Sequence, residues 1–189
     1  RQKRCALMFK YSIIFFFFIF IVNSSAEIKE KIIKNLKQTK NLDFKFEQNI
    51  NGKIENGNCT IEYPRKIFCK YARSNNKILV SNGKSLVIKT RSSYYRYPLE
   101  KTALYLILNK NYLINKINDL KGRIVDNKLI NFTIIENENE INIFFDSETF
   151  NLTGWQNTDI YQNFNITFIS SIRKNRVLKK NLFKLPLQN

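Results

Sequence analysis

The stretch that decides the fold is residues 78–90, ILVSNGKSLVIKT. Two short apolar runs flank Asn82-Gly83, and Asn-Gly between apolar runs is the strongest short-range signal for a tight β-hairpin turn. A strand with one face in solvent alternates apolar and polar residues, yet both arms of this hairpin, ILV and LVI, are apolar at consecutive positions. Either the hairpin is covered on both faces, or one face meets an apolar substance that is not protein.

Working outward, alternation with a period of two predicts about ten strands in antiparallel meander order. In residues 42–50, for example, Leu42, Phe44, Phe46 and Ile50 share one face. Other strands are expected at 55–63, 67–71, 77–81, 85–90, 94–97, 129–136, 140–146, 150–157, 164–170 and, last and short, 182–185. Gly52 and Gly57 are expected to bracket a connection, and Phe164, Ile166 and Phe168 to form one apolar face. A single sheet this wide must curl.

Two segments show the residue pattern of helices. Residues 27–41 place Ile28, Ile32, Ile33 and Leu36 on one helical face, with Lys and Glu elsewhere. Residues 100–108, EKTALYLIL, contain six consecutive apolar residues without β alternation, and the helix is expected to extend or repeat through 112–120. Both helical pieces are available to cover the open, concave side of the sheet.

The hairpin centred on Pro64 allows its register to be predicted. A three-residue connection pairs residues whose numbers sum to 128, so Ile61 faces Ile67 and Cys59 faces Cys69 on the apolar side. Directly opposed residues have Cβ atoms roughly 4.5–5.5 Å apart, somewhat longer than a disulfide prefers, but a closely spaced pair can adjust. A disulfide between Cys59 and Cys69 and two buried thiols both fit this pattern.

The first 26 residues are interpreted as a signal peptide. Four basic residues precede or flank an unbroken apolar run, Ile13–Val22, and small residues up to Ala26 suit cleavage after that position. Ten apolar residues are about half of the ~20 that a membrane-spanning helix needs, and the alternative is an uncleaved signal anchor. We expect residues 27–189 to form one soluble, exported domain, and Cys5 to leave with the signal.

Composition argues against several function classes. The chain has 32 Lys and Arg, 15 Asp and Glu and no His, a formal net charge of +17. Without residues 1–26, which hold four basic residues and no acid, the charge is 28 − 15 = +13. Export makes nucleic acid a poor partner, and the scattered lysines indicate a solvated surface. Without His there is no imidazole base or ligand, so we expect neither an enzyme nor a metal or cofactor site.

Three segments together resemble a known family, the periplasmic outer-membrane lipoprotein carrier proteins. LDFKFEQ at 42–48 is similar to the family's first strand, which ends in Phe-x-Gln. LVSNGKSL at 79–86 is close to its Val-Ser-Asp-Gly-Lys-Thr-Leu, and LTGW at 152–155, followed by Asp159 and a strand, resembles its C-terminal half. With the apolar helix after Tyr97-Pro98-Leu99, the resemblance covers nearly all of 27–185.

The resemblance implies a mainly β fold with helices: an incomplete, unclosed antiparallel β-barrel capped by an N-terminal helix and a central helical lid. It implies a cavity for the acyl chains of lipoproteins, an inner-membrane lipoprotein-releasing ABC transporter that loads the carrier, and an outer-membrane lipoprotein receptor that unloads it. We expect a monomer in the periplasm. The family commonly has an Arg before the Pro of the second hairpin, which ties lid to barrel. Here Tyr63 holds that position and Arg65 follows Pro64, so Arg65 is the candidate lid latch.

Strand parity and helix spacing select the residues that would form the cavity. The candidate wall residues are Phe44, Phe46, Ile61, Tyr63, Ile134, Ile143 and Phe145, and the candidate lid residues are Ile32, Leu36, Leu104, Ile107 and Leu108. The alternative is that the same residues form an ordinary filled core. Other function classes left open are a lipid or lipopeptide sensor of the same fold, an envelope-tethering module that uses the basic surface, and, least favoured, an enzyme.

Overall fold

The computed structural model describes residues 23–72, 75–136, 139–158 and 163–188. The predicted signal segment up to Val22, with its apolar run and Cys5, lies outside the described residues. The first described element is helix α2 (Asn23–Gln38), which starts four residues before the expected cleavage point. Within the described ranges, no helix combines the length and the apolar composition that crossing a membrane requires.

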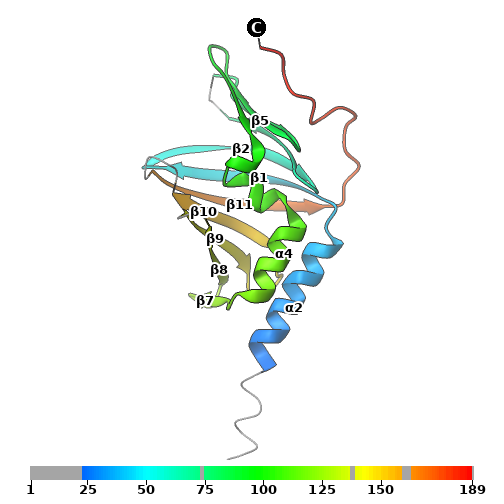
Figure 1. Cartoon of the computed structure of the whole chain (residues 1–189), viewed down its shortest axis with the longest axis vertical. Helices are drawn as coiled ribbons and strands as arrows, with labels where there is room; N and C mark the ends of the chain where they lie inside the picture. The colour runs from blue at the N-terminus through cyan, green and yellow to red at the C-terminus, as the bar shows by residue number, and fades with distance from the viewer. Residues whose placement is uncertain (1–22, 73–74, 137–138, 159–162, 189) are drawn as a thin grey trace, which may run out of the picture.

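An antiparallel sheet of eleven strands forms the body of the molecule (Figure 1). The strands are β1 (Asn41–Ile50), β2 (Lys53–Glu62), β3 (Lys66–Tyr71), β4 (Ile78–Asn82), β5 (Ser85–Lys89), β6 (Tyr94–Pro98), β7 (Arg123–Val125), β8 (Leu129–Glu136), β9 (Asn139–Asp146), β10 (Leu152–Thr158) and β11 (Phe164–Lys174). Their order in the sheet is β6-β5-β4-β3-β2-β1-β11-β10-β9-β8-β7. The first strand therefore pairs with the last, and a right-handed twist accumulated over this width curls the sheet.

The barrel stays open because β6 and β7 are edge strands that do not pair with each other. The segment between them forms the short 3₁₀ helix η1 (Leu99–Lys101) and helices α3 (Leu104–Leu108) and α4 (Lys110–Asp119). Together with α2, which runs beside α4 in Figure 1, these helices cover the concave side of the sheet. The predicted fold class, an unclosed antiparallel barrel capped by an N-terminal helix and a central lid, is confirmed.

Two details of the predicted strand list were wrong. The sheet has eleven strands because β7 adds a three-residue edge that alternation over so short a length does not reveal. The expected strand at 182–185 is instead part of a turn, in which the Leu182 N–H donates to the Lys179 carbonyl oxygen at 3.3 Å. This C-terminal segment is therefore not a strand of the sheet.

The hairpin that opened the sequence analysis is β4–β5, with Ser81 paired to Leu86 and Gly83 at a φ of +97° in the turn. Leu79 and Leu86 point to the interior and join its apolar cluster. Val80 and Val87 point to the outer face, yet they are 1% and 0% exposed. Both faces of this hairpin are therefore covered by the protein itself.

The C-terminal segment 175–188 explains the cover on the outer face. Lys89 Nζ donates to the Leu187 carbonyl oxygen at 2.7 Å, and the Tyr94 hydroxyl donates to the Pro186 carbonyl oxygen at 3.3 Å. Lys66 Nζ lies 5.8 Å from the centre of the Phe183 ring. Since Lys66, Lys89 and Tyr94 share the outer face with Val80 and Val87, the segment lies over that face.

The β2–β3 register agrees with the prediction, since Ile61 pairs with Ile67 and Cys59 with Cys69. Gly57, expected in a connection, instead lies inside β2. A Cβ there would be 2.2 Å from the Lys70 carbonyl oxygen and 2.8 Å from Cε1 of Phe46. Only glycine lets the Phe46 ring lie across this strand, which is why the prediction from glycine as a turn signal was wrong.

The predicted inner face of β11 was also wrong. Phe164 and Phe168 are each 44% exposed on the outer face, and the Phe168 ring stacks on Phe144 with 6.0 Å between centroids. Thr167 and Ile169 point inward instead. The inward Thr167 has a polar partner there, since Gln48 Nε2, from the inner side of β1, donates to its hydroxyl at 3.2 Å.

Candidate functional site: the interior beneath the helical lid

All seven candidate wall residues face the interior from the curled sheet. Phe44 and Phe46 come from β1, Ile61 from β2, Ile134 from β8, and Ile143 and Phe145 from β9, and each is at most 5% exposed. Tyr63, just beyond the end of β2, packs against the same cluster while remaining partly exposed. The strands bring residues about a hundred positions apart in sequence onto one apolar surface.

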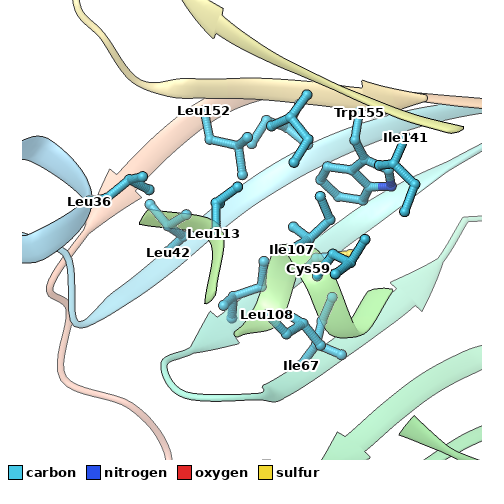
Figure 2. Close-up of a cluster of buried hydrophobic side chains, with 14 of the residues drawn as sticks. Leu36, Leu42, Cys59, Ile67, Ile107, Leu108, Leu113, Ile141, Leu152 and Trp155 are labelled. Atoms are coloured by element: carbon cyan, nitrogen blue, oxygen red, sulfur yellow. The ribbon is translucent and has the colours of Figure 1, made fainter. Parts of the chain in front are cut away.

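The candidate lid residues complete the same cluster from the other side. Ile32 and Leu36 project from α2, and Ile107 and Leu108 from α3, all at most 5% exposed, while Leu104 is half-buried. Helix α4 adds Leu113, Ile114 and Ile117, which the sequence analysis did not select. Figure 2 shows Leu36, Leu113 and Leu152 converging from α2, α4 and β10.

The lid residues fill the interior in this form of the protein. In the described part of the chain, Ile107, Leu108 and Leu113 of the lid and Ile143 and Phe145 of the wall are each 0% exposed, so no water-sized space lies against them. A small cavity beside α2, lined by Leu36, Leu42, Phe150, Leu152 and others, has a volume of about 10 Å³, about the space of one water molecule. Lid side chains therefore occupy the place that the resemblance assigns to cargo.

Three sets of polar contacts hold α4 to its surroundings. In the first, the Tyr112 hydroxyl bonds to the Glu136 carboxylate of β8, and Lys116 Nζ lies 3.9 Å from the same group. Partial burial and the bond to Glu136 raise the pKa of Tyr112. In the second, at the C-terminal end of α4, Lys29 Nζ of α2 donates to the Asn118 carbonyl oxygen at 2.8 Å.

At the N-terminal end of α4, Lys110 forms the third set. Its Nζ donates to the Thr39 carbonyl oxygen at 2.9 Å and lies 5.4 Å from the centre of the Tyr63 ring. Partial burial lowers the pKa of Lys110. Such contacts of partly exposed groups are individually weak, so they hold the lid without making closure irreversible.

Helix α2 is fastened mainly through Asn35. Its Nδ2 donates to the carbonyl oxygens of Thr149 and Phe150 at 3.1 and 3.0 Å and to Asn151 Oδ1 at 2.9 Å, all in the β9–β10 connection. Lys174 donates to the Oδ1 of the same Asn35. Helix α2 is also followed directly by β1, which ties its C-terminal end to the sheet.

The contact between lid and second hairpin differs from the latch that was predicted. The backbone N–H of Arg65 donates to the Leu108 carbonyl oxygen, at the C-terminal end of α3, over 2.9 Å. The Arg65 side chain is exposed. The latch hypothesis for its guanidinium is therefore corrected: position 65 reaches the lid through its backbone.

Tyr63 contributes an unusual group to the lid junction. Among the described residues, its hydroxyl oxygen is buried without a hydrogen-bond partner, although the residue as a whole is partly exposed. Burial raises the pKa of the Tyr63 phenol well above its ordinary value. An unpaired buried hydroxyl costs free energy, so it disfavours the closed arrangement in which it is buried.

The two other features of the wall are a disulfide and a charged pair. Cys59 and Cys69 are joined by a disulfide between β2 and β3, with Cα atoms 4.1 Å apart. Nearer the β1–β2 turn, Glu55 faces inward and pairs with Lys77 at 2.5 Å, and Lys77 Nζ lies 4.1 Å from the centre of the Tyr71 ring. One end of the interior is therefore polar, whereas the end beneath the lid is apolar.

Comparison with known proteins can now be set beside this geometry. The family model for the outer membrane lipoprotein carrier protein LolA matches residues 37–186. The chain belongs to this family. No curated protein matches the sequence significantly. The LolA match begins at the last turn of α2 and covers the whole sheet and the central lid.

Solved structures show the same fold at low identity. An uncharacterized conserved protein from Thermus thermophilus has a TM-score of 0.52 at 8% identity, covering 86% of this chain and 94% of that one. MucB has a TM-score of 0.50 at 6% identity, covering 87% of this chain and 63% of MucB. The LolA superfamily protein NE2245 from Nitrosomonas europaea is also similar, with a TM-score of 0.47, 9% identity and coverages of 85% and 97%.

Sequence reasoning missed the residues that fasten the LolA-type lid. Lys110, Tyr112 and Glu136 were not selected because a lysine, a tyrosine and a glutamate on predicted surfaces are common and uninformative alone. Their partners are 24 to 71 positions away in sequence. Only the fold brings them together.

Proposed function

We propose that the protein is a periplasmic carrier that shields the acyl chains of lipoproteins and moves them from the inner to the outer membrane. The observation that carries the proposal is the way the lid covers the sheet. The lid helices η1, α3 and α4 span the gap between the two edge strands and cover an apolar wall, so moving them exposes that wall. Family membership supports the same conclusion.

The energetics of transfer explain how such a site works without a preformed hollow. Each methylene removed from water contributes about 0.8 kcal/mol, so a chain of about fifteen methylenes gains about 12 kcal/mol on leaving water. In the closed form the lid side chains pack against the apolar wall, and in a loaded form acyl chains take their place. The difference between these two sets of contacts, and not their sum, sets the affinity, and a modest difference permits release.

The remaining parts of the proposal concern the cellular setting. Residues 27–189 act as one domain after removal of the signal peptide, and the protein works as a monomer without cofactor or catalytic step. An inner-membrane lipoprotein-releasing ABC transporter loads it, and an outer-membrane lipoprotein receptor accepts the cargo. The basic, exported chain suits transport between two membrane surfaces.

The test is binding of an acylated peptide to the purified exported protein. We expect a lipopeptide with a diacylated N-terminal cysteine to bind, and the same peptide without acyl chains not to bind. Mass spectrometry of the protein as purified should also detect bound lipid. If neither retained lipid nor lipopeptide binding is found, the carrier proposal is wrong. Binding without any transfer to outer-membrane vesicles supports a sensor instead.

A further inference from the structure

A polar groove of about 360 Å³ lies between the last turn of α2 and the length of α4. Its lining residues are Lys37, Lys110, Asn111, Ile114, Asn115 and Asn118. Lys37 belongs to the last turn of α2, and the others lie on α4. Four of the six, Lys37, Asn111, Asn115 and Asn118, are exposed to solvent, and only Ile114 also belongs to the buried apolar cluster.

The side chains of this groove are suited to an oxyanion. Five of the six lining residues carry N–H donors, two of them as ammonium groups, and none of the six is acidic. The N-terminus of α4, with its partial positive charge, starts at Lys110. The acidic residues of α2, Glu27 and Glu30, lie two turns or more away toward its N-terminus.

The surroundings extend this positive surface. Lys34 and Lys40 are exposed on either side of Lys37, and the chain as a whole carries a formal charge of +17. Clustered lysines near a surface are attracted to anionic lipid headgroups. The transporter and the receptor of the proposed carrier both lie at membranes, so the phosphate source that fits both the charge and the place is the bilayer.

We propose that the groove between α2 and α4 binds phosphate headgroups of an anionic membrane, so that the protein docks with its lid against the bilayer. The choice of a bilayer rests on the proposed carrier function. The groove lies on the element that must move to expose the interior. Docking in this orientation presents the lid, and the wall beneath it, to the source or destination of the acyl chains.

Docking and the position of the lid are coupled through Lys110, because this residue belongs to the groove and to the lid contacts. In the closed form its ammonium group donates to the Thr39 carbonyl oxygen at 2.9 Å and contacts the Tyr63 ring. The groove is lined by Lys37 of α2 and Lys110 of α4 together, so it exists as a site while the two helices lie side by side. A headgroup held in the groove therefore favours the closed lid.

The first test is co-sedimentation of the exported protein with vesicles of phosphatidylglycerol and phosphatidylcholine in equal parts, against vesicles of phosphatidylcholine alone. We expect binding to the anionic vesicles only, and loss of that binding in high salt. The double variant Lys37→Gln/Lys110→Gln should partition roughly 30-fold more weakly, about five-fold for each lysine. Equal binding to both vesicle types would overturn the proposal, because an electrostatic docking site requires anionic headgroups.

The matched control is Lys45→Gln/Lys70→Gln, which removes the same charge from exposed positions on the outer face of β1 and β3. We expect this control to bind anionic vesicles nearly as well as the unaltered protein. Equal losses in the two double variants would show that net charge alone acts, with no docking site.

The coupling has its own readout in hydrogen exchange. The Arg65 amide bonds to the Leu108 carbonyl oxygen of the lid, so its exchange rate reports lid opening. Anionic vesicles should slow this exchange in the unaltered protein and not in Lys110→Gln. Lipopeptide binding measured without vesicles separates the two proposals. If the protein binds lipopeptide but not vesicles, only the docking proposal is wrong. If it binds vesicles but not lipopeptide, only the carrier proposal is wrong.

Discussion

The ammonium nitrogen of Lys110 lies 5.4 Å from the centre of the Tyr63 ring, and this pair joins the lid to the barrel beside a hydroxyl group that has no partner among the described residues. The cation–π contact and the hydrogen bond from Lys110 to Thr39 favour closure. The buried Tyr63 hydroxyl is an unfavourable group at the same place. The junction therefore combines two favourable contacts with one unfavourable group.

Removing the Tyr63 hydroxyl should stabilise the protein. Tyr63→Phe keeps the ring and its contact with Lys110 but eliminates the unpaired buried group, a gain of about 1–3 kcal/mol in the free energy of unfolding. Urea unfolding measures it. The matched control is Tyr112→Phe, which loses the bond to Glu136 and should be less stable. A loss of stability in Tyr63→Phe would mean that its hydroxyl has a partner, such as a buried water.

The same phenol should give the protein a distinctive alkaline sensitivity. Burial raises the pKa of Tyr63 and of Tyr71 above the value of about 10 found in unfolded chains. Above pH 10 the unfolded state releases these protons while the folded state keeps them, so stability is full below pH 10 and falls as pH rises. Each group contributes about 1.4 kcal/mol per pH unit.

Urea unfolding at pH 9 and pH 11 tests this dependence. Between these two values Tyr63→Phe should lose about 1.4 kcal/mol less than the unaltered protein, and Tyr63→Phe/Tyr71→Phe should lose less again. Lysine titration in the same range is common to all three proteins and cancels in the comparison. Identical pH dependence in all three would contradict the burial of these phenols.

The disulfide between β2 and β3 should contribute to stability through a short loop. Cys59 and Cys69 are ten residues apart, and closing a loop of that size is worth about 2–3 kcal/mol in the unfolded state. We expect Cys59→Ala/Cys69→Ala to lose that amount in urea unfolding. Reductant should destabilise the unaltered protein similarly and leave the variant unchanged. Two thiols that react with a labelling reagent in denaturant without reductant would contradict the bond.

The parts of the fold that the sequence reveals are those set by local rules. The Asn82-Gly83 turn, the pairing of Cys59 with Cys69 and the inward face of β9 follow from turn chemistry and from side chains that alternate along a strand. For strand β11 the alternation rule does not predict the inward face. Its segment FNITFIS has apolar residues at both parities, and the side that faces inward follows from its pairing with β1, where Gln48 bonds to Thr167 across 119 residues of sequence.

The state of the interior also lies beyond a local prediction. Parity places Phe145 and Ile143 on the concave face, but it does not say whether lid or cargo meets them. That depends on how far the helices between β6 and β7 reach into the barrel. Helix α4, whose Leu113 and Ile117 are fully buried, supplies the side chains that close the space. The filled interior therefore emerges only from the packing of long-range elements.

A pair of variants can decide whether this filled interior is a site or only a core. Ile107 on the lid and Ile143 on the wall are both 0% exposed, so replacing either by Ala should cost about 2–5 kcal/mol of stability. Their effects on lipopeptide affinity should differ in sign. Ile107→Ala removes contacts that exist only with the lid closed, which favours opening and tightens binding, about ten-fold for each 1.4 kcal/mol. Ile143→Ala removes a surface that cargo also uses, so binding should weaken.

Fluorescence titration with a labelled lipopeptide measures the affinity of both variants. If the two variants change affinity in the same direction, or not at all, lid and cargo do not compete for the wall, and the interior acts as an ordinary core.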